Sequence, residues 1–269
     1  MGSEMCIRDR PGDIRNMLPV SAPERAESMD EIIADLDRVV MPGVAHWQHP
    51  GWYAFFPSGA SPVSALGEFV AAGLATQGMM WSTAPAATEI ENTVLDWLVD
   101  LLGLPSSWRL DEGPGGGVIQ MSASDSTHLS LAVARHQFEL SGADANSLVA
   151  YGSSQAHSSI EKGARIAGFK HIRSVPVTQT FGIDADAFVR IVRDDIDSGL
   201  IPAWVCSAVG TTNTTAIDPI RAIAAIAAEN GMWHHADAAY AGSAMICPEF
   251  RELQDCLLYT SDAADDSLR

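Results

Sequence analysis

The stretch that decides the fold is Trp233–Gly242, which reads WHHADAAYAG. Before it, Asp218-Pro219 gives a helix start and Asn230-Gly231 gives a helix stop, so 232–236 is predicted to be a strand that follows this helix. Asp237 then falls at the carboxyl end of that strand, among small residues. A carboxylate there is costly unless a cation meets it. In open α/β sheets this edge is where ligands bind.

Strand and helix signals alternate along the chain before this stretch. Apolar runs of strand length, each bounded by turn residues, predict further strands at 118–121, 148–151, 171–175 and 203–209. Helical patterns lie between them: one from near Ser124 to Gly142, one opened by a Ser158/Glu161 capping box and closed at Gly168, and one capped by Asp184 and ended by Gly199. This βαβ series predicts a mostly parallel sheet flanked by helices.

The residues before this series are predicted to be helical. Ser28 and Glu31 form a capping-box signal for one helix, and another follows Pro85 and ends at Gly103. Between them, 65–80 is apolar almost all round. Such a helix is typical of a core or of a subunit interface.

The composition describes a globular chain of 269 residues, 47% hydrophobic, without an apolar run long enough to span a bilayer. Its 34 acidic and 16 basic residues argue against nucleic acid and anionic membranes as partners. The four cysteines have neither metal-site spacing nor the density of a disulfide scaffold, and no secretory apolar segment is evident. We therefore expect a cytoplasmic protein without a metal site.

Polar residues follow three of the predicted strands. Ser122–Ser126 leads directly into a helix and offers N–H groups and hydroxyls to an anion such as phosphate, although Ser124 as an ordinary helix cap explains the pattern equally well. His157 lies in the loop after 148–151, where it could stack on a ring, transfer a proton, or serve structure alone. The loop 210–215 adds hydroxyls that turn chemistry would also explain. His235 and Asp237 could share a metal, but no third ligand is evident.

Four segments, in this order and spacing, resemble the pyridoxal-phosphate-dependent group II decarboxylases, in particular their aromatic-L-amino-acid branch. They are GGGVIQMSASDS (115–126), YGSSQAHSSIEKGARIAG (151–168), the Gly-Thr-Thr loop at 210–212 and HHADAAYAGSAMICPEFR (234–251). MPGVAHWQHPGWYAFFPSGAS (41–61) and WSTAPAATEIENTVLDWL (81–98) extend the likeness, which covers roughly Pro11–Leu253.

The resemblance implies the domain organisation. It predicts an α/β, fold-type I PLP-dependent transferase-like large domain with a mostly parallel sheet flanked by helices, covered in part by residues 111–255. An N-terminal helical and substrate-side segment, residues 11–110, precedes it. Members of the family are typically homodimers, so a homodimer is expected here as well.

The resemblance also implies pyridoxal 5'-phosphate as the cofactor and decarboxylation of an aromatic L-amino acid to the amine and carbon dioxide as the reaction. The positions that it places in the cofactor site are Ala123, Ser124, His157, Thr212, Asp237 and Ala239. Ala123 and Ser124 would contact the phosphate, and Thr212 and Ala239 would complete the surface on which the cofactor lies. His157, stacked on the ring, and Asp237, paired with the ring nitrogen, are the expected catalytic residues. A carboxylate beside that nitrogen favours its protonated form, and a pyridinium withdraws electrons better than a pyridine.

A further set of residues matches the family's substrate-side segment: Trp47, Phe55, Phe56, Pro57 and Ser58. An aromatic wall suits an aromatic side chain, but an aromatic cluster also suits a core or a dimer interface. Phe55 stands where well-known relatives have tyrosine, which leaves the choice between catechol, indole and phenyl substrates open. Met121 replaces their usual glycine.

The largest departure from the family concerns lysine. The chain has two, Lys162 and Lys170, and neither matches the Schiff-base lysine, which follows the Asp strand after a further strand and a histidine. We therefore expect a part of a longer enzyme, without the mobile catalytic loop and the small C-terminal domain, and inactive by itself. Residues 1–10 and 256–269 break the family pattern and are predicted to be a non-native leader and tail.

Two alternatives stay open. A decarboxylase of histidine or diaminobutyrate, or an aldehyde synthase, would share most of these motifs on the same scaffold. A chain without the lysine could instead be a remnant that binds the cofactor only noncovalently, or does not bind it.

Overall fold

The computed structural model describes residues 10–53, 55, 61–113 and 115–254. The predicted leader up to residue 9 and the predicted tail lie outside these residues. The chain forms two compact units that divide between Gln77 and Gly78. The α-helices are α1 Asp13–Met17, α2 Met29–Asp35, α3 Pro62–Leu74, α4 Pro85–Leu102, α5 Ala123–Leu140, α6 Ser159–Ile166, α7 Ala185–Asp197 and α8 Ile220–Glu229. The strands are β1 Leu148–Ser153, β2 His171–Val175, β3 Ile201–Ala208 and β4 Trp233–Asp237.

The first unit contains α1, α2 and α3. The predicted capping box is confirmed, because Ser28 Oγ accepts the Glu31 N–H at 3.3 Å and Glu31 Oε2 accepts the Ser28 N–H at 2.8 Å. α3 begins after Ser61, with Pro62 in its first turn, and ends at Leu74 before Ala75 in the left-handed region. None of its residues is buried against the rest of its own unit, so a place in a core stays a prediction. An interface role stays a prediction as well.

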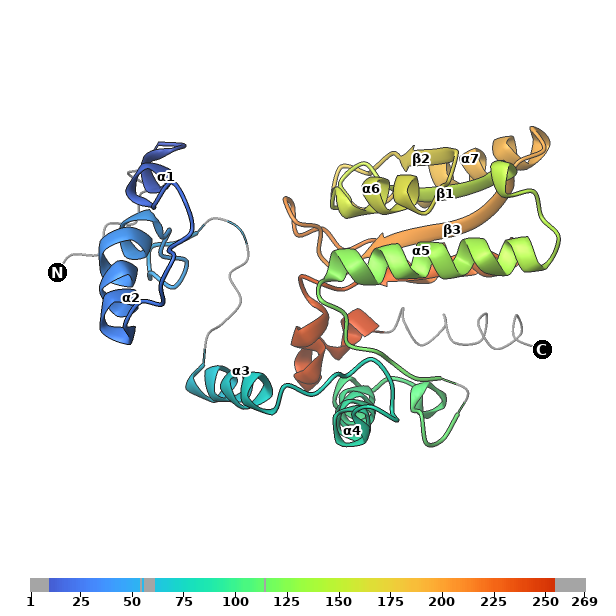
Figure 1. The fold of residues 1–269 in the computed structure, drawn as a ribbon. Coiled ribbons are helices and arrows are strands. Elements are labelled where there is room, and N and C mark those ends of the chain that lie inside the picture. The colour runs from blue at the N-terminus through green and yellow to red at the C-terminus, as the bar shows by residue number, and fades with distance from the viewer. Residues whose placement is uncertain (1–9, 54, 56–60, 114, 255–269) are drawn as a thin grey trace. The chain divides into compact units, whose positions relative to one another are not determined.

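The second unit is built on a four-stranded parallel sheet with the order β2-β1-β3-β4 (Figure 1). Ala208 pairs with Asp237 in the register of β3 and β4, so the carboxyl ends of these strands lie side by side. The predicted α/β class with a parallel sheet is confirmed. None of the helices that the structure describes has the length and apolar character needed to cross a bilayer.

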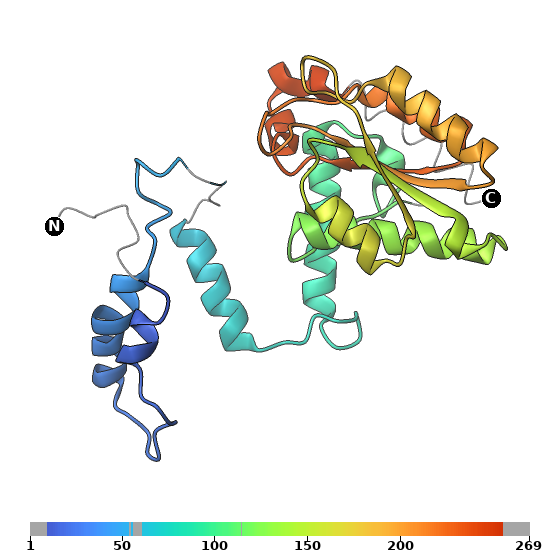
Figure 2. The same ribbon diagram turned by 90° about the horizontal axis from the view of Figure 1, so that it is seen from above.

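Helices cover both faces of this sheet (Figure 2). Leu131 of α5 and Ile160 of α6 pack on Trp204 of β3. On the other face, Phe188 of α7 and Ile223 of α8 pack on Val205, the next residue of the same strand, and on Tyr151. Neighbouring strand residues point to opposite faces, so β3 is apolar on both, as a parallel strand between two helix layers must be.

The predicted strand at 118–121 is not formed. Val118 is 57% exposed and Met121 is 96% exposed, and the Ile119 N–H donates to Glu91 Oε1 of α4 at 2.8 Å instead of to a strand. A strand needs a neighbour for its backbone groups. Within the described residues nothing pairs with this segment, and apolar content alone did not reveal that.

Two predicted helix caps are also wrong. Ser158 precedes α6 but its side chain caps nothing. Asp218 precedes α8, yet its carboxylate is buried and accepts the N–H groups of Ile183 at 2.8 Å and of Ala208 at 2.7 Å. For Asp218, tertiary partners replace the local one that the sequence pattern predicted.

Candidate functional site

The first turn of α5 presents unpaired backbone donors at the sheet's carboxyl edge. Ser122 is the cap, since its Oγ accepts the Asp125 N–H at 3.2 Å and donates to Asp125 Oδ2 at 2.8 Å. The alternative of Ser124 as the cap is therefore wrong, and Ala123 and Ser124 lie inside the first turn. N–H groups in this turn have no partner in the helix and carry its positive dipole end. Both residues are exposed, so they can bind an anion.

Asp237 ends β4, as predicted. Its Oδ1 accepts the Ala239 N–H at 3.2 Å, and its carbonyl accepts the Val209 N–H at 2.8 Å. The side chain is half-buried, and none of the ion pairs between described residues involves it. The carboxylate is thus held in place at the sheet edge without a cationic partner from this part of the chain.

The loop after β3 lies beside the end of β4. Thr211 is buried and ties the loop together, with its Oγ1 2.6 Å from Thr214 Oγ1 and accepting the Ala216 N–H at 3.2 Å. Gly210 has φ +89°, and a Cβ there would lie 2.3 Å from the ring of Tyr240. Only glycine permits this close approach. Thr212, the predicted site residue, is exposed.

His157 replaces the predicted Ser158/Glu161 box at the start of α6. Its Nδ1 accepts the Ser159 N–H at 3.2 Å and lies 2.8 Å from Ser159 Oγ. The imidazole is therefore anchored at one nitrogen while the residue stays exposed. This suits a ring that covers a ligand.

A cavity of about 210 Å³ lies between α5 and α6, and of the predicted cofactor residues only Ser124 and His157 are among the residues that line it. His128 and Lys162 line it as well. The structure therefore brings two of the predicted cofactor residues together from segments more than thirty positions apart. Thr212, Asp237 and Ala239 lie at the adjoining ends of β3 and β4. The sequence did not reveal that Lys162 would line this cavity.

A buried layer that the sequence analysis did not assign lies behind Asp237. His235 Nε2 is 3.3 Å from Thr127 Oγ1 of α5, and the ring stacks on Trp204 with centroids 5.6 Å apart. Burial lowers the pKa of His235. The alternation of side chains along β4 puts His235 and Asp237 on one face. This alternation is the only feature of the sequence that could have pointed to His235. No group of three possible metal ligands exists within the described residues.

The substrate-side residues belong to the first unit. Trp47 stacks on Phe55 with ring centroids 5.5 Å apart and on Trp52 at 5.4 Å. Phe55 adopts φ 58°, a left-handed conformation that is rare for a bulky residue. Phe56, Pro57 and Ser58 lie outside the described residues.

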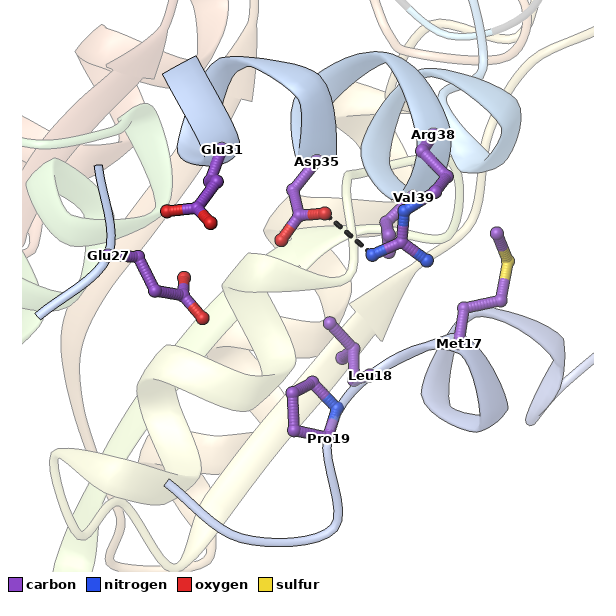
Figure 3. A pocket seen from close by; sticks show the side chains of 8 residues that line it. All are labelled: Met17, Leu18, Pro19, Glu27, Glu31, Asp35, Arg38 and Val39. Carbon is purple, nitrogen blue, oxygen red and sulfur yellow. Dashed lines mark hydrogen bonds and ion pairs between the residues drawn. The ribbon is translucent and has the colours of Figure 1, made fainter. Parts of the chain in front are cut away.

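A second cavity, of about 460 Å³, lies in the first unit and is lined partly by Glu27, Glu31 and Asp35 (Figure 3). Asp35 is paired with Arg38 at 2.6 Å. None of the predicted site residues lines it. Its excess of carboxylates would repel a phosphate, so it is not the site of an anionic cofactor.

Residues 11–264 match the pyridoxal-dependent decarboxylase conserved domain. A phenylacetaldehyde synthase of Arabidopsis thaliana is 42% identical over 91% of this chain and 51% of its own length. An aromatic-L-amino-acid decarboxylase of Catharanthus roseus is 42% identical over 91% of this chain and 50% of its own. The Oryza sativa TDC solved with PLP and tryptamine superposes with a TM-score of 0.89 at 38% identity, over 95% of this chain and 56% of that one. The chain thus spans about half the length of these proteins.

Proposed function

This chain belongs to the pyridoxal-dependent decarboxylase family, and from that premise we propose that its protein converts an aromatic L-amino acid to the amine and carbon dioxide with pyridoxal 5'-phosphate. The observation that carries the proposal is Asp237, a half-buried acid fixed at the sheet edge without a cation from the described residues. The anion-binding turn of α5 lies on the neighbouring element. A cofactor with a phosphate at one end and a ring nitrogen at the other would supply an anion for the turn of α5 and a partner for the Asp237 carboxylate.

The residues present fit this cofactor. The N–H groups of Ala123 and Ser124 would hold the phosphate, with Thr212 and Ala239 beside the ring and His157 across its face. When bound, pyridoxal phosphate supplies an electron-withdrawing ring that takes up the electron pair left at the substrate's α-carbon as carbon dioxide departs.

Asp237 would keep a proton on the ring nitrogen. The Ala239 N–H anchors its Oδ1, which leaves Oδ2 to face the ring. Two opposite charges about 4 Å apart attract by roughly 4 kcal/mol at an effective dielectric of 20, before desolvation is subtracted. This is enough to fix the protonation state of a pyridine.

His157 is the second proposed catalytic group. Because its Nδ1 accepts the Ser159 N–H, the neutral ring carries its proton on Nε2. The imidazole can therefore cover the cofactor ring and donate from Nε2 at the same time. Its anchoring by α6 keeps the ring from rotating away.

For the substrate side, we propose that Trp47, Phe55, Phe56, Pro57 and Ser58 contact the aromatic side chain. The stacking of Trp47 on Phe55 supports this, since a ready-made aromatic surface can accept another ring. The acid-lined cavity of Figure 3 is not part of this assignment.

An aldehyde synthase is the second candidate, favoured by the relative from Arabidopsis thaliana, which is as similar as the decarboxylase. An aldehyde product requires an oxidant such as dioxygen, whereas decarboxylation to the amine requires none. Incubation of the complete enzyme with tyrosine, DOPA, tryptophan, phenylalanine, histidine and diaminobutyrate separates the candidates, with carbon dioxide, amine, aldehyde and oxygen uptake measured. Release of carbon dioxide from none of them contradicts both.

The lysine prediction has its own test. Titration with pyridoxal phosphate, followed by borohydride reduction and peptide mapping, shows whether an imine forms. We expect reversible binding without a trapped imine at Lys162 or Lys170. An adduct at Lys162, which lines the cavity with Ser124 and His157, would contradict the expectation that neither lysine serves.

We also propose that the protein is a cytoplasmic homodimer. Cys206 and Cys247 are free thiols, as in a reducing compartment. The apolar side chains of α3 are exposed, with Phe69 at 77%, which supports a subunit interface.

A further inference from the structure

A run of buried hydrogen bonds joins β4 to the first turn of α5. His235 Nε2 lies 3.3 Å from Thr127 Oγ1, which in turn lies 3.0 Å from the carbonyl oxygen of Ala123. A carbonyl can only accept, so the single hydroxyl proton of Thr127 goes to Ala123. Thr127 must then accept from His235, and this assigns the imidazole proton to Nε2.

Burial favours the neutral form of this imidazole. Burial lowers the pKa of His235, and the Asp237 carboxylate opposes that effect only in part. His235 therefore acts as a fixed hydrogen-bond donor and does not itself neutralise Asp237.

Two further contacts fix the orientation of the ring and of its partner. The imidazole stacks on Trp204 with an interplanar angle of 22°. Trp204 is fully buried and donates from Nε1 to Ser130 Oγ at 3.2 Å, and Ser130 donates to the Thr127 carbonyl at 2.8 Å. The ring cannot rotate without losing both the stack and the bond to Thr127.

We infer that His235 is a positioning residue that sets the separation between the phosphate-binding turn of α5 and the carboxylate of Asp237. The inference rests on the proposed function. His235 and Asp237 lie two residues apart on one face of β4, and Thr127 lies one turn beyond Ala123, so the bond joins the two elements directly behind the site.

A rigid cofactor makes this separation matter. In pyridoxal phosphate the phosphate and the ring nitrogen lie at opposite ends of one aromatic ring, so both ends are bound well only at one spacing. A displacement of about 1 Å at such a site can cost a large factor in activity. Pyridoxal, which lacks the phosphate, needs no such match.

The test compares the affinities of the chain for pyridoxal phosphate and for pyridoxal, measured by absorbance or fluorescence titration. His235→Phe keeps a ring against Trp204 but loses the donor, and Thr127→Val loses the acceptor. We expect each to weaken pyridoxal phosphate about tenfold, and pyridoxal by less than about threefold. The double variant should be no worse than either single one, because both remove the same bond.

Conservative and matched variants separate positioning from stability. Thr127→Ser and His235→Gln retain a hydroxyl and a donor and should restore most of the preference for the phosphate form. Tyr151→Phe removes a buried 3.0 Å bond to Asp195 elsewhere in the sheet, and should lower the unfolding midpoint without changing the affinity ratio.

The outcomes are distinct. If the unaltered chain binds neither compound, the proposed function fails and this inference falls with it. If the chain prefers pyridoxal phosphate but His235→Phe weakens both compounds equally, as a loss of folded protein would, only the positioning role is overturned. Should His235→Phe not fold, Thr127→Val against Thr127→Ser decides by the same ratio.

Discussion

Adjacent histidines near the end of β4 face opposite sides of the sheet and meet different partners. His235 bonds Thr127 of α5, whereas His234 Nε2 lies 2.7 Å from Ser207 Oγ, and His234 Nδ1 is buried without a partner in the described structure. Burial lowers the pKa of His234 to about 4. A proton on this ring would be desolvated, so protonation opposes folding.

This predicts an acid-dependent loss of stability with a defined window. The unfolded chain takes up the proton near the ordinary pKa of 6.5 and the folded chain only near about 4, so stability falls as the pH drops between these values. At pH 5 the uptake of this proton by the unfolded chain lowers the free energy of unfolding by about 2 kcal/mol. Urea unfolding of the parent chain and of His234→Val at pH 7.5 and pH 5 measures it. Equal pH dependence in the two proteins would contradict the prediction.

For Asp237 we predict a loss of cofactor affinity without a loss of fold. Asp237→Asn keeps the shape and the acceptor for the Ala239 N–H but has no charge to favour a protonated ring. Pyridoxal phosphate should bind at least about tenfold more weakly, as seen by titration. Asp184→Asn is the control, since asparagine caps α7 as well as aspartate does. Unchanged affinity in Asp237→Asn would remove the ring-nitrogen role.

At the scale of elements, the sequence predicted what local chemistry decides. The strand at the start of WHHADAAYAG, the helix stop at Gly168 and the cap at Asp184 all follow from nearby residues, and all are confirmed. The strand at 118–121 failed because a strand depends on a neighbour that local sequence does not specify. The cap expected from Asp218 failed because tertiary donors bind its carboxylate.

The candidate site also has some features that the sequence predicted and others that depend on tertiary contacts. Strand order alone placed Asp237 and the 210–215 loop at one edge, since carboxyl ends of parallel strands meet there. The bond between Thr127 and His235 joins residues 108 positions apart, so only the folded chain shows it. The anchoring of His157 by Ser159 was equally hidden behind a plausible capping box.

At the scale of elements we make a prediction for Asp218, whose side chain closes the loop that bears Thr212. Its two oxygens accept from separate donors, Ile183 through Oδ1 and Ala208 through Oδ2. Asp218→Ala should destabilise the chain by about 2–3 kcal/mol, since buried N–H groups would lose their acceptor. Asp218→Asn retains one acceptor oxygen and should lose about half as much. Urea unfolding gives both values. A loss in Asp218→Ala with no loss in Asp218→Asn, which keeps the shape of the side chain, would show that packing and not hydrogen bonding is what matters.

At the scale of the whole molecule, charge and apolar surface act against each other. The net charge of -18 makes copies of this chain repel one another. The exposed apolar side chains of α3 favour association, because each large one contributes about 2 kcal/mol when fully buried. The balance depends on ionic strength, since salt screens the repulsion over about 10 Å at 0.1 M and leaves apolar burial intact.

The proposed homodimer is tested on α3. Phe69 and Leu66, 77% and 64% exposed, lie on neighbouring positions of its surface. Phe69→Glu should shift the sedimentation-equilibrium mass from dimer towards monomer, and added salt should strengthen dimerisation of the parent chain. Ile196→Glu places the same charge on α7, at a side chain 45% exposed, and should leave the mass unchanged. If both substitutions dissociate the dimer equally, general repulsion explains the result and α3 is not the interface. A parent chain that stays monomeric at high salt would refute the dimer itself.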